Sequence, residues 1–517
     1  MTGTERSHDR PRSNDPRRAI SAHRCRLLLS RAFSNRYANG LLSLTAHGPL
    51  SILPATASLR ESTACLDSKG EGVCTVASTN PLPPGSNGLP LLGETLAFAS
   101  NPFAFIHERR ARFGDVFRTS ILGSRTVFIA GPKHVGTWLD PTKVQREGAM
   151  PPNLLALFGG RADIVPLLDG ATHAQRKRSL LAAFSPDAVA SYMPGLQSRI
   201  EALLGKWLAQ GQGPVTAELK TLAIESLAGA IMGLEPGEEL TRLLADNAIL
   251  AKAFVALPIK VPGTAYAKGL QARDRILALL EAIVRRHLDS PPAQPDGLSR
   301  ILAAAQEAGA PLDPRTAACE MHHFLLAGMI VYAELAATLR ALHEHPDVRE
   351  RLRAEVLASA ASGPVGRAQL RTMPYLMQVV DEVKRTCPNV PMSFGRARSA
   401  IDFAGYTVPQ GTLMMMAVYE SNLDPIFTAP EKFDPERFSA ERDERKRAPD
   451  AFAPQGAGTL TGHKCAGYDF ATVMMQLFAV LALRTASWDL PEQDLSLKWV
   501  VPPEHKSGLV VRWSKAT

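Results

Sequence analysis

Cysteine is scarce in this sequence, and the cysteines present follow no regular framework. Only six occur among 517 residues, and three of them lie within the first 80 positions. This spacing argues against a disulfide scaffold and favours a reducing compartment. The body of the chain also lacks a basic stripe with interleaved aromatic residues, so we expect no nucleic-acid partner.

The sequence has no long uninterrupted hydrophobic run. The apolar patch at residues 41–59 is broken by a histidine, a glycine and two prolines, and no other stretch is predicted to span a membrane. We therefore expect a soluble, cytoplasmic protein without a membrane span that acts as a monomer.

Acidic residues are absent from residues 16–60, which are rich in Arg, Ser and Ala. This composition is typical of an organellar transit peptide, which would make the protein organellar. Alternatively, the true start lies downstream, because the next methionine after Met1 is Met150 and a valine codon such as Val73 could serve as the start. Both interpretations treat residues 1–79 as a basic leader without a folded domain.

The remaining chain has ordinary globular composition, with 45% hydrophobic and 21% charged residues. A Pro- and Gly-rich run at residues 80–95 marks where the folded part begins, and we predict one domain over residues 80–517. Apolar residues recur every three or four positions from about 170 to 387, which predicts helices, whereas residues 116–131 read as two strands around a Gly-Ser turn. The predicted fold class is mainly α with a small β portion (α+β).

One predicted helix is unusually long and apolar. It begins after Asp313 as N-cap, with Pro314 in the first helical position, and runs about thirty residues to Pro346. Because its middle is apolar on all sides, we expect it to pass through the interior.

A glycine-rich loop surrounds Cys465 in the segment FAPQGAGTLTGHKCAGYDFA, residues 452–471. A zinc site would need more ligands than His463 and Cys465, a nucleophilic thiol would need a base that spacing does not identify, and a lone cysteine is often only structural. The glycines argue against the structural interpretation, because they let a flat group approach the main chain. An apolar helix follows directly and would stabilise a thiolate at its N-terminus, an arrangement that suits an axial ligand of haem iron.

This loop resembles the haem-binding loop of the cytochrome P-450 superfamily, in which Phe, a Gly-rich run and a basic residue precede Cys-x-Gly. The matching residues are Phe452, Gly456, Gly458, Gly462, His463, Cys465 and Gly467. The loop is longer than usual, with His463 in place of Arg, and is similar to that of the peroxide-using, fatty-acid-hydroxylating branch. The resemblance implies the superfamily's triangular prism of helices, and haem b bound through the Cys465 thiolate.

Other motifs follow in the order that the superfamily requires. Glu382 and Arg385 resemble its Glu-x-x-Arg pair, and Arg437 in the segment EKFDPERF is implied to bind both behind the cysteine loop. The same spacing at Glu444 and Arg447, among other places, is interpreted as a solvated helix pair.

The resemblance also implies basic partners for the haem propionates. His173 matches the first of two basic positions on one helix, and Lys177 stands where the superfamily has Arg. Either Arg396 or Arg398 would hold the other propionate, and the sequence does not decide between them.

The central helix departs from the superfamily pattern. Most members have Ala-Gly, a variable residue, an acid and then Thr, which relay protons to iron-bound oxygen. Here Ala327 and Gly328 match, but Ile330 and Val331 replace the acid and the alcohol, and neither can carry a proton. The residues expected to face substrate are Phe324, Leu325, Ala327, Gly328, Ile330 and Val331.

Three explanations for the missing relay remain open at this point. Tyr332 or Glu334 substitutes if the helix bulges, the substrate supplies the polar group, or the enzyme uses peroxide or rearranges a hydroperoxide. The resemblance implies a monooxygenase that inserts oxygen from dioxygen into an apolar lipid, terpenoid or retinoid-like substrate. It would take electrons from a separate ferredoxin or flavoprotein, since the haem domain ends near Val511 without a fused reductase. The alternatives are a peroxygenase and a haem-dependent isomerase or haem-binding protein.

Overall fold

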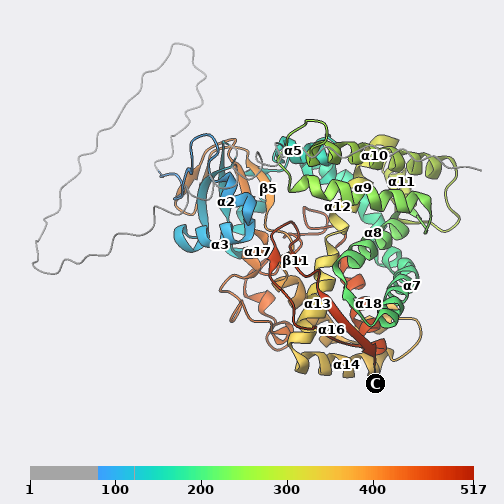
Figure 1. Ribbon diagram of the computed structural model, residues 1–517. Helices are drawn as coiled ribbons and strands as arrows, with labels where there is room; N and C mark the ends of the chain where they lie inside the picture. The colour runs from blue at the N-terminus through green and yellow to red at the C-terminus, as the bar shows by residue number, and fades with distance from the viewer. Residues whose placement is uncertain (1–79, 122, 517) are drawn as a thin grey trace, which may run out of the picture. The chain divides into compact units, whose positions relative to one another are not determined.

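The computed structural model describes residues 80–121 and 123–516 of the chain (Figure 1). Helices predominate in this part, and the strands form small sheets, which confirms the predicted fold class. The predicted leader, residues 1–79, lies outside the described residues.

The largest sheet joins strands from opposite ends of the described chain. Its order is β1-β2-β8-β5-β3, with β8 parallel to β2 and the other neighbours antiparallel. The strands are β1 (Val116–Ile121), β2 (Ser124–Ile129), β3 (Val144–Gln145), β5 (Ser393–Ala397) and β8 (Leu413–Met416), preceded by helices α2 (Thr95–Ser100) and α3 (Pro102–Phe113). The two strands predicted around the Gly-Ser turn are β1 and β2.

Three smaller sheets complete the β portion. They are the β4-β12-β9 sheet, with β4 (Gln212–Pro214), β9 (Ala486–Asp489) and β12 (Val510–Lys515), the pair β6 (Ile401–Phe403) and β7 (Tyr406–Val408), and the pair β10 (Leu497–Lys498) and β11 (Glu504–His505). Gly405, with φ of 82°, turns the chain between β6 and β7.

Helices form the rest of the fold (Figure 1). Those outside the central pair are α4 (Val135–Leu139), α5 (Pro152–Leu157), α6 (Gly170–Leu181), α7 (Pro186–Gln210), α8 (Thr216–Met232), α9 (Glu238–Phe254), α10 (Ala265–Asp289), α11 (Gly297–Glu307), α14 (Pro346–Ala360), α15 (Arg367–Arg371), α16 (Pro374–Thr386), α17 (Val418–Asn422) and α18 (Tyr468–Thr485). Short 3₁₀ turns are η1 (Pro132–His134), η2 (Val165–Leu167), η3 (Ala182–Phe184), η4 (Pro435–Phe438) and η5 (Glu444–Arg447).

The predicted long helix is two helices with a short interruption. They are α12 (Pro314–Gly328) and α13 (Val331–Glu344), and turn residues 329 and 330 separate them. The Asp313 side chain accepts the Thr316 N–H at 3.0 Å and so caps α12 as predicted. The stretch Pro314–Glu344 meets the length and hydropathy of a membrane span, but 61% of its most apolar window is buried inside the described part of the protein.

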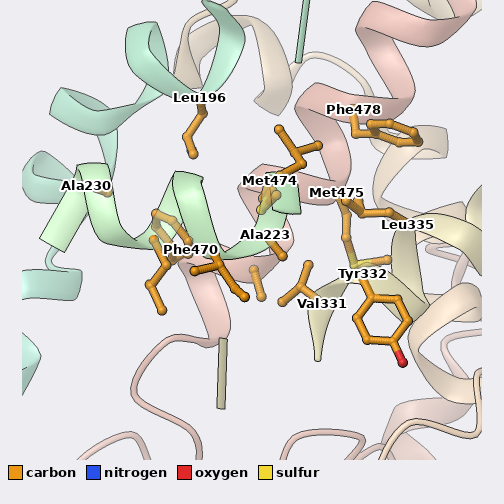
Figure 2. Close-up of a cluster of buried hydrophobic side chains, with 14 of the residues drawn as sticks. Leu196, Ala223, Ala230, Val331, Tyr332, Leu335, Phe470, Met474, Met475 and Phe478 are labelled. Carbon is orange, nitrogen blue, oxygen red and sulfur yellow. The ribbon is translucent and has the colours of Figure 1, made fainter. Parts of the chain in front are cut away.

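The core is built around α18, which starts three residues after Cys465. Its side chains are buried on all sides, and Phe470, Met474 and Met475 meet Val331 of α13 in the cluster that Figure 2 shows. A helix that is buried all round is held in place by packing on every side. The loop that carries Cys465 therefore ends on a rigid element.

Candidate functional site

The Cys465 loop is closed by its own backbone. The Cys465 N–H donates to the Gln455 carbonyl oxygen at 3.1 Å, and the Gly458 N–H donates to Asp450 Oδ1 at 2.8 Å. Gly456 and Gly458 have φ angles of 91° and 83°, a region that side chains with a Cβ disfavour. At Gly458 an added Cβ would lie 3.0 Å from Leu139 Cδ1. The glycines are thus needed for the path of this loop.

Cys465 itself is half-buried just before the N-cap of α18, Gly467. Burial raises the pKa of its thiol, while the positive charge of Lys177, the Gly467 amide and the charge of Lys384 act in the opposite direction. In the described part of the chain no three His, Cys, Asp or Glu side chains are grouped to hold a metal ion, so Cys465 has no companion ligands there.

Two predicted residues of α6 reach this loop. His173 and Lys177 are both buried, at 6% and 4% exposed, and Lys177 Nζ donates to the Lys464 carbonyl oxygen at 2.6 Å. The His173 ring stacks on His463 with centroids 4.1 Å apart. Burial and the nearby charge of Arg146 lower the pKa of His463 to about 3, so its imidazole is neutral at physiological pH.

Arg146 belongs to the same cluster, although no sequence pattern identified it. Its guanidinium lies over the Trp138 ring at 4.0 Å, and its Nη2 donates to the Trp138 carbonyl oxygen at 3.2 Å. Its Nη1 is buried and has no hydrogen-bond partner. Burial lowers the pKa of Arg146 to about 10. An orphaned donor on a buried cation is unfavourable unless an anion binds it.

Asp169, the residue before α6, lies between Arg146, His463 and Arg398. Its carboxylate accepts the backbone N–H groups of Arg146 and Glu147 at 2.9 and 3.0 Å and lies 3.9 Å from His463 Nε2. Arg398 lies 3.6 Å from the same carboxylate. The loop before α6 is therefore tied to the chain after β3.

Arg396 and Arg398 both lie at this side of the large sheet. Arg396 Nε donates to the Gly148 carbonyl oxygen at 3.0 Å and its Nη1 to the Gly411 carbonyl oxygen at 2.7 Å. Arg398 Nε donates to the Pro141 carbonyl oxygen at 2.9 Å. Both side chains are at least partly exposed, so both stay candidates for a propionate.

The residues fit a haem with its two propionates. A thiol on an open glycine backbone suits the iron, and the orphaned Nη1 of Arg146, with the cations around it, suits carboxylates on the group's edge. Phe452, at the start of the loop, packs against a small apolar cluster, with its ring centroid 5.0 Å from that of Phe438.

The central helix meets the loop through Phe184. This ring lies 3.6 Å from the position of a Cβ on Gly467 and 5.2 Å from the ring of Phe324 in α12. Near the end of α12, Ala327 is exposed although its predecessors Phe324, Leu325 and Leu326 are buried. An exposed residue inside a core helix marks open space beside that helix.

The residues predicted to face substrate differ in their burial. Ala327 is exposed and Ile330 is half-buried, as expected for residues beside open space, whereas the Cβ position of the half-buried Gly328 lies against Leu227 of α8. Leu325 and Val331, at 0% and 5% exposed, instead pack into the core, Val331 in the cluster of Figure 2. Met329 and Ile330 keep right-handed helical backbone angles, and the N–H groups of Tyr332 and Ala333 donate to carbonyl oxygens three residues earlier, so the helix is tightened locally at this turn.

Tyr332 and Glu334 do not share the orientation of Ile330. The Tyr332 hydroxyl donates to the Pro502 carbonyl oxygen at 3.2 Å, beside a cavity of about 380 Å³ whose lining includes no residue of the Cys465 loop. Glu334 Oε1 accepts from Asn389 Nδ2 at 3.1 Å. The interruption of the helix therefore does not turn either residue toward the exposed face of Ala327.

The structure brings Glu382, Arg385 and Arg437 together as a buried network. Arg385 Nε donates to Glu382 Oε2 at 2.8 Å and Arg437 Nε to the same oxygen at 3.0 Å, and all three side chains are 0% exposed. Arg437 Nη1 also donates to Glu444 Oε2 at 3.0 Å. The interpretation of Glu444 as part of a solvated pair is therefore wrong, because the turn at η5 directs this carboxylate inward.

A comparison with protein-family models also points to a haem-binding protein, over almost all of the described residues. The model described as Cytochrome P450 matches residues 83–510.

Individual proteins show the same similarity. The chain is 31% identical over 435 residues to putative cytochrome P450 120 of Synechocystis sp., which covers 84% of this chain and 96% of that protein. It is 27% identical to abscisic acid 8'-hydroxylase CYP707A1 of Solanum lycopersicum, covering 84% and 91%. The solved structure of retinoic acid bound cyanobacterial CYP120A1 matches with a TM-score of 0.78 and 30% identity, over 85% of this chain and all of that one.

Proposed function

This chain belongs to the cytochrome P450 family, and we propose that it binds haem b through Cys465 and hydroxylates an isoprenoid carboxylic acid. Members of the family are haem-thiolate monooxygenases, so the chain is an oxidoreductase that takes haem b, an apolar substrate and electrons from a redox partner. The observation that carries the assignment of Cys465 is the cluster of cations around its loop, including the orphaned Nη1 of Arg146. We also propose that the protein is a monomer and that a separate ferredoxin or flavoprotein supplies its electrons.

Burial raises the pKa of the Cys465 thiol, and the groups around it act in the opposite direction. The Gly467 amide and the cation of Lys177 both favour the thiolate. When bound, haem b supplies the iron at which dioxygen is activated, so that one oxygen atom enters a C–H bond.

The cations at the edge of the site would hold the haem through its propionates. Arg146 Nη1 would donate to one propionate, next to the stacked rings of His173 and His463. Arg396 or Arg398 would hold the other. Since His463 is neutral beside so many positive charges, bound carboxylates would also relieve their mutual repulsion.

Two observations support the proposed substrate class: the apolar side chains of the central helix and the substrates named for similar proteins. Ala327 and Ile330 offer no hydrogen bond and would exclude water from the substrate. Retinoic acid is bound in one similar structure, and abscisic acid is named as the substrate of a similar enzyme. Both are small isoprenoid acids with a mostly apolar carbon frame.

Peroxide use is the second candidate function, and the observation that favours it is the absence of a proton carrier at Ile330 and Val331. The dioxygen route consumes two electrons and two protons and releases water with the alcohol product. Hydrogen peroxide supplies the oxygen atom and both electron equivalents, and also leaves water. The peroxide route needs no protons from this wall.

Reduction of the purified protein under carbon monoxide tests the ligand. The wild type is expected to show the Soret shift of a thiolate complex, and Cys465→Ser is expected to lose it. Cys319→Ala, at a cysteine packed in a separate core cluster, is the matched control and keeps the shift. A wild type without this shift would overturn the proposal.

Turnover distinguishes the two candidate reactions. Retinoic acid and abscisic acid are supplied with either a reduced ferredoxin system or peroxide alone, with retinol and myristic acid as comparison substrates. Hydroxylation of an isoprenoid acid with ferredoxin supports the proposal. Turnover of myristic acid with peroxide alone, and none with ferredoxin, would assign the peroxygenase function instead.

A further inference from the structure

A lysine lies buried behind the Cys465 loop. Lys384 of α16 stands between Glu382 and Arg385 in sequence and is 2% exposed. Its Nζ donates to Gln455 Oε1 at 3.0 Å and to Thr472 Oγ1 at 2.6 Å. The same Nζ lies 4.0 Å from the centroid of the Tyr468 ring. All of these partners belong to the loop or to α18, and none to the Glu382 network.

Gln455 links this lysine to Cys465. The Gln455 carbonyl oxygen accepts the Cys465 N–H at 3.1 Å, while the Gln455 side chain accepts from Lys384. The charge of Lys384 also favours the ionised form of the thiol. Lys384 therefore acts on the sulfur in two ways, through the position of the loop and through its charge.

A buried carboxyl group on α13 faces the same region. Glu334 is 1% exposed, its Oε1 accepts from Asn389, and its Oε2 has no hydrogen-bond partner. Burial lowers the pKa of Lys384 and raises the pKa of Glu334, and the charge of each residue opposes the shift of the other. The charge of Asp381 opposes the shift of Lys384 as well. Asp381 is paired with Arg445 at 2.8 Å, which leaves Glu334 as the less compensated carboxyl group. Helices α13, α16 and α18, which carry Glu334, Lys384 and Thr472, pack against one another.

The buried network around Glu382 does not include Lys384. The Glu382, Arg385 and Arg437 network is complete without it, and an apolar side chain could fill a buried helix position without the free-energy cost of burying an ammonium group. The charge is instead placed behind the sulfur in a region from which water is excluded, where electrostatic interactions are strongest.

We propose that Lys384 is a positioning residue of the thiolate site, whose buried positive charge, balanced by Glu334, sets the electron donation of Cys465 and hence the reduction potential of the haem iron. The inference rests on Cys465 as the ligand. Groups around a metal ligand tune the metal through charge and hydrogen bonds. Reduction adds a negative charge at the iron, so a nearby positive charge favours the reduced form.

Potentiometric titration of the holoenzyme tests the proposal. Lys384→Met keeps the length of the side chain and removes its charge, and is expected to lower the midpoint potential. Lys384→Arg is expected to restore most of the wild-type value. Lys446→Met removes a charge from a side chain that is 79% exposed and is expected to leave the potential unchanged, because solvent screens it.

Glu334→Gln gives an independent measurement if Lys384→Met does not fold. It removes the balancing negative charge and is expected to raise the midpoint potential. A Lys384→Met protein that keeps the thiolate Soret shift and the wild-type potential would overturn the inference, even if its stability fell. Failure of the ligand assignment would be seen separately, as the absence of the thiolate shift in the wild type.

Discussion

His173 of α6 and His463 of the Cys465 loop stack ring on ring, with centroids 4.1 Å apart and an angle of 30° between the planes. The two residues are 290 positions apart in the sequence and lie beside the buried guanidinium of Arg146. The contact ties α6 to the loop and places two imidazoles where a haem propionate is proposed to bind.

Arg146→Met is expected to weaken haem retention. A hydrogen bond to a charged group contributes about 1.5–3 kcal/mol, which corresponds to roughly 10- to 100-fold in affinity. Transfer of haem to an excess of apomyoglobin measures the loss rate. Arg125→Met removes an exposed arginine of β2 and is expected to lose haem at the wild-type rate. Equal rates in Arg146→Met and the wild type would contradict the assignment of this arginine.

His173→Phe keeps the ring contact with His463 and removes both ring nitrogens. We expect a faster haem loss in the same assay, with a thermal midpoint of the haem-free protein close to that of the wild type, since the stacking is retained. If only the stability of the haem-free protein changed, His173 would be a structural residue.

Acid is expected to destabilise the protein through Glu444. Burial raises the pKa of this carboxyl group, but hydrogen bonds from Arg442 and Thr428 and the charge of Arg437 outweigh it and lower the pKa from 4.5 to about 2. A group whose pKa is lowered on folding stabilises the folded state above its unfolded pKa and loses that contribution as pH falls toward its folded pKa. The contribution of Glu444 is therefore complete above pH 4.5 and declines toward pH 2. Urea unfolding from about pH 6 to about pH 2 measures this decline.

Glu444→Gln tests the same interaction at neutral pH. Because it leaves Arg437 with an incompletely paired buried charge, we expect a loss of about 3–5 kcal/mol in the free energy of unfolding. The variant is also expected to show a weaker dependence of stability on pH in the acid range. A pH dependence identical to that of the wild type would show that other carboxyl groups dominate.

Gly328→Ala is expected to destabilise the protein by about 1–3 kcal/mol. The added Cβ would lie 2.4 Å from Leu227 Cδ2, where α12 and α8 approach closely. Gly205→Ala on α7 meets no atom within 4 Å and is expected to stabilise the protein by about 0.5–1 kcal/mol. Thermal unfolding of the two variants should therefore shift in opposite directions. Leu227→Ala combined with Gly328→Ala should be less destabilising than the sum of the single changes.

Val331→Thr restores the alcohol of the superfamily pattern, yet it is not expected to improve the coupling of electrons to product. Val331 is 5% exposed and packs in the core, so the hydroxyl would cost about 1–3 kcal/mol and would not reach the exposed face of Ala327. Ile330→Thr, at a half-buried position, is expected to raise the yield of product per electron consumed. A gain from Val331→Thr alone would contradict this orientation.

Local patterns predicted much of the fold. Asp313 and Pro314 start α12, the alternating residues form β1 and β2, and glycines with positive φ shape the Cys465 loop, because each of these features depends on a few neighbouring residues. The interruption after Gly328 was missed, because apolar residues continue through it and their pattern shows no break. Val331 lies among buried side chains of the core.

The sequence by itself determined the cysteine loop, its glycines and the helix that follows, since backbone conformation and helix capping are local properties. It also determined that positions 330 and 331 of the central helix carry no proton donor or acceptor in their side chains. Only the tertiary structure decided that Arg146 joins the cluster around the loop, that Glu444 turns inward to Arg437, and that Lys384 reaches Gln455. These contacts connect segments that are separated in the sequence by loops or turns. Their electrostatic interactions are strong only because the groups are buried, so no local pattern could predict them.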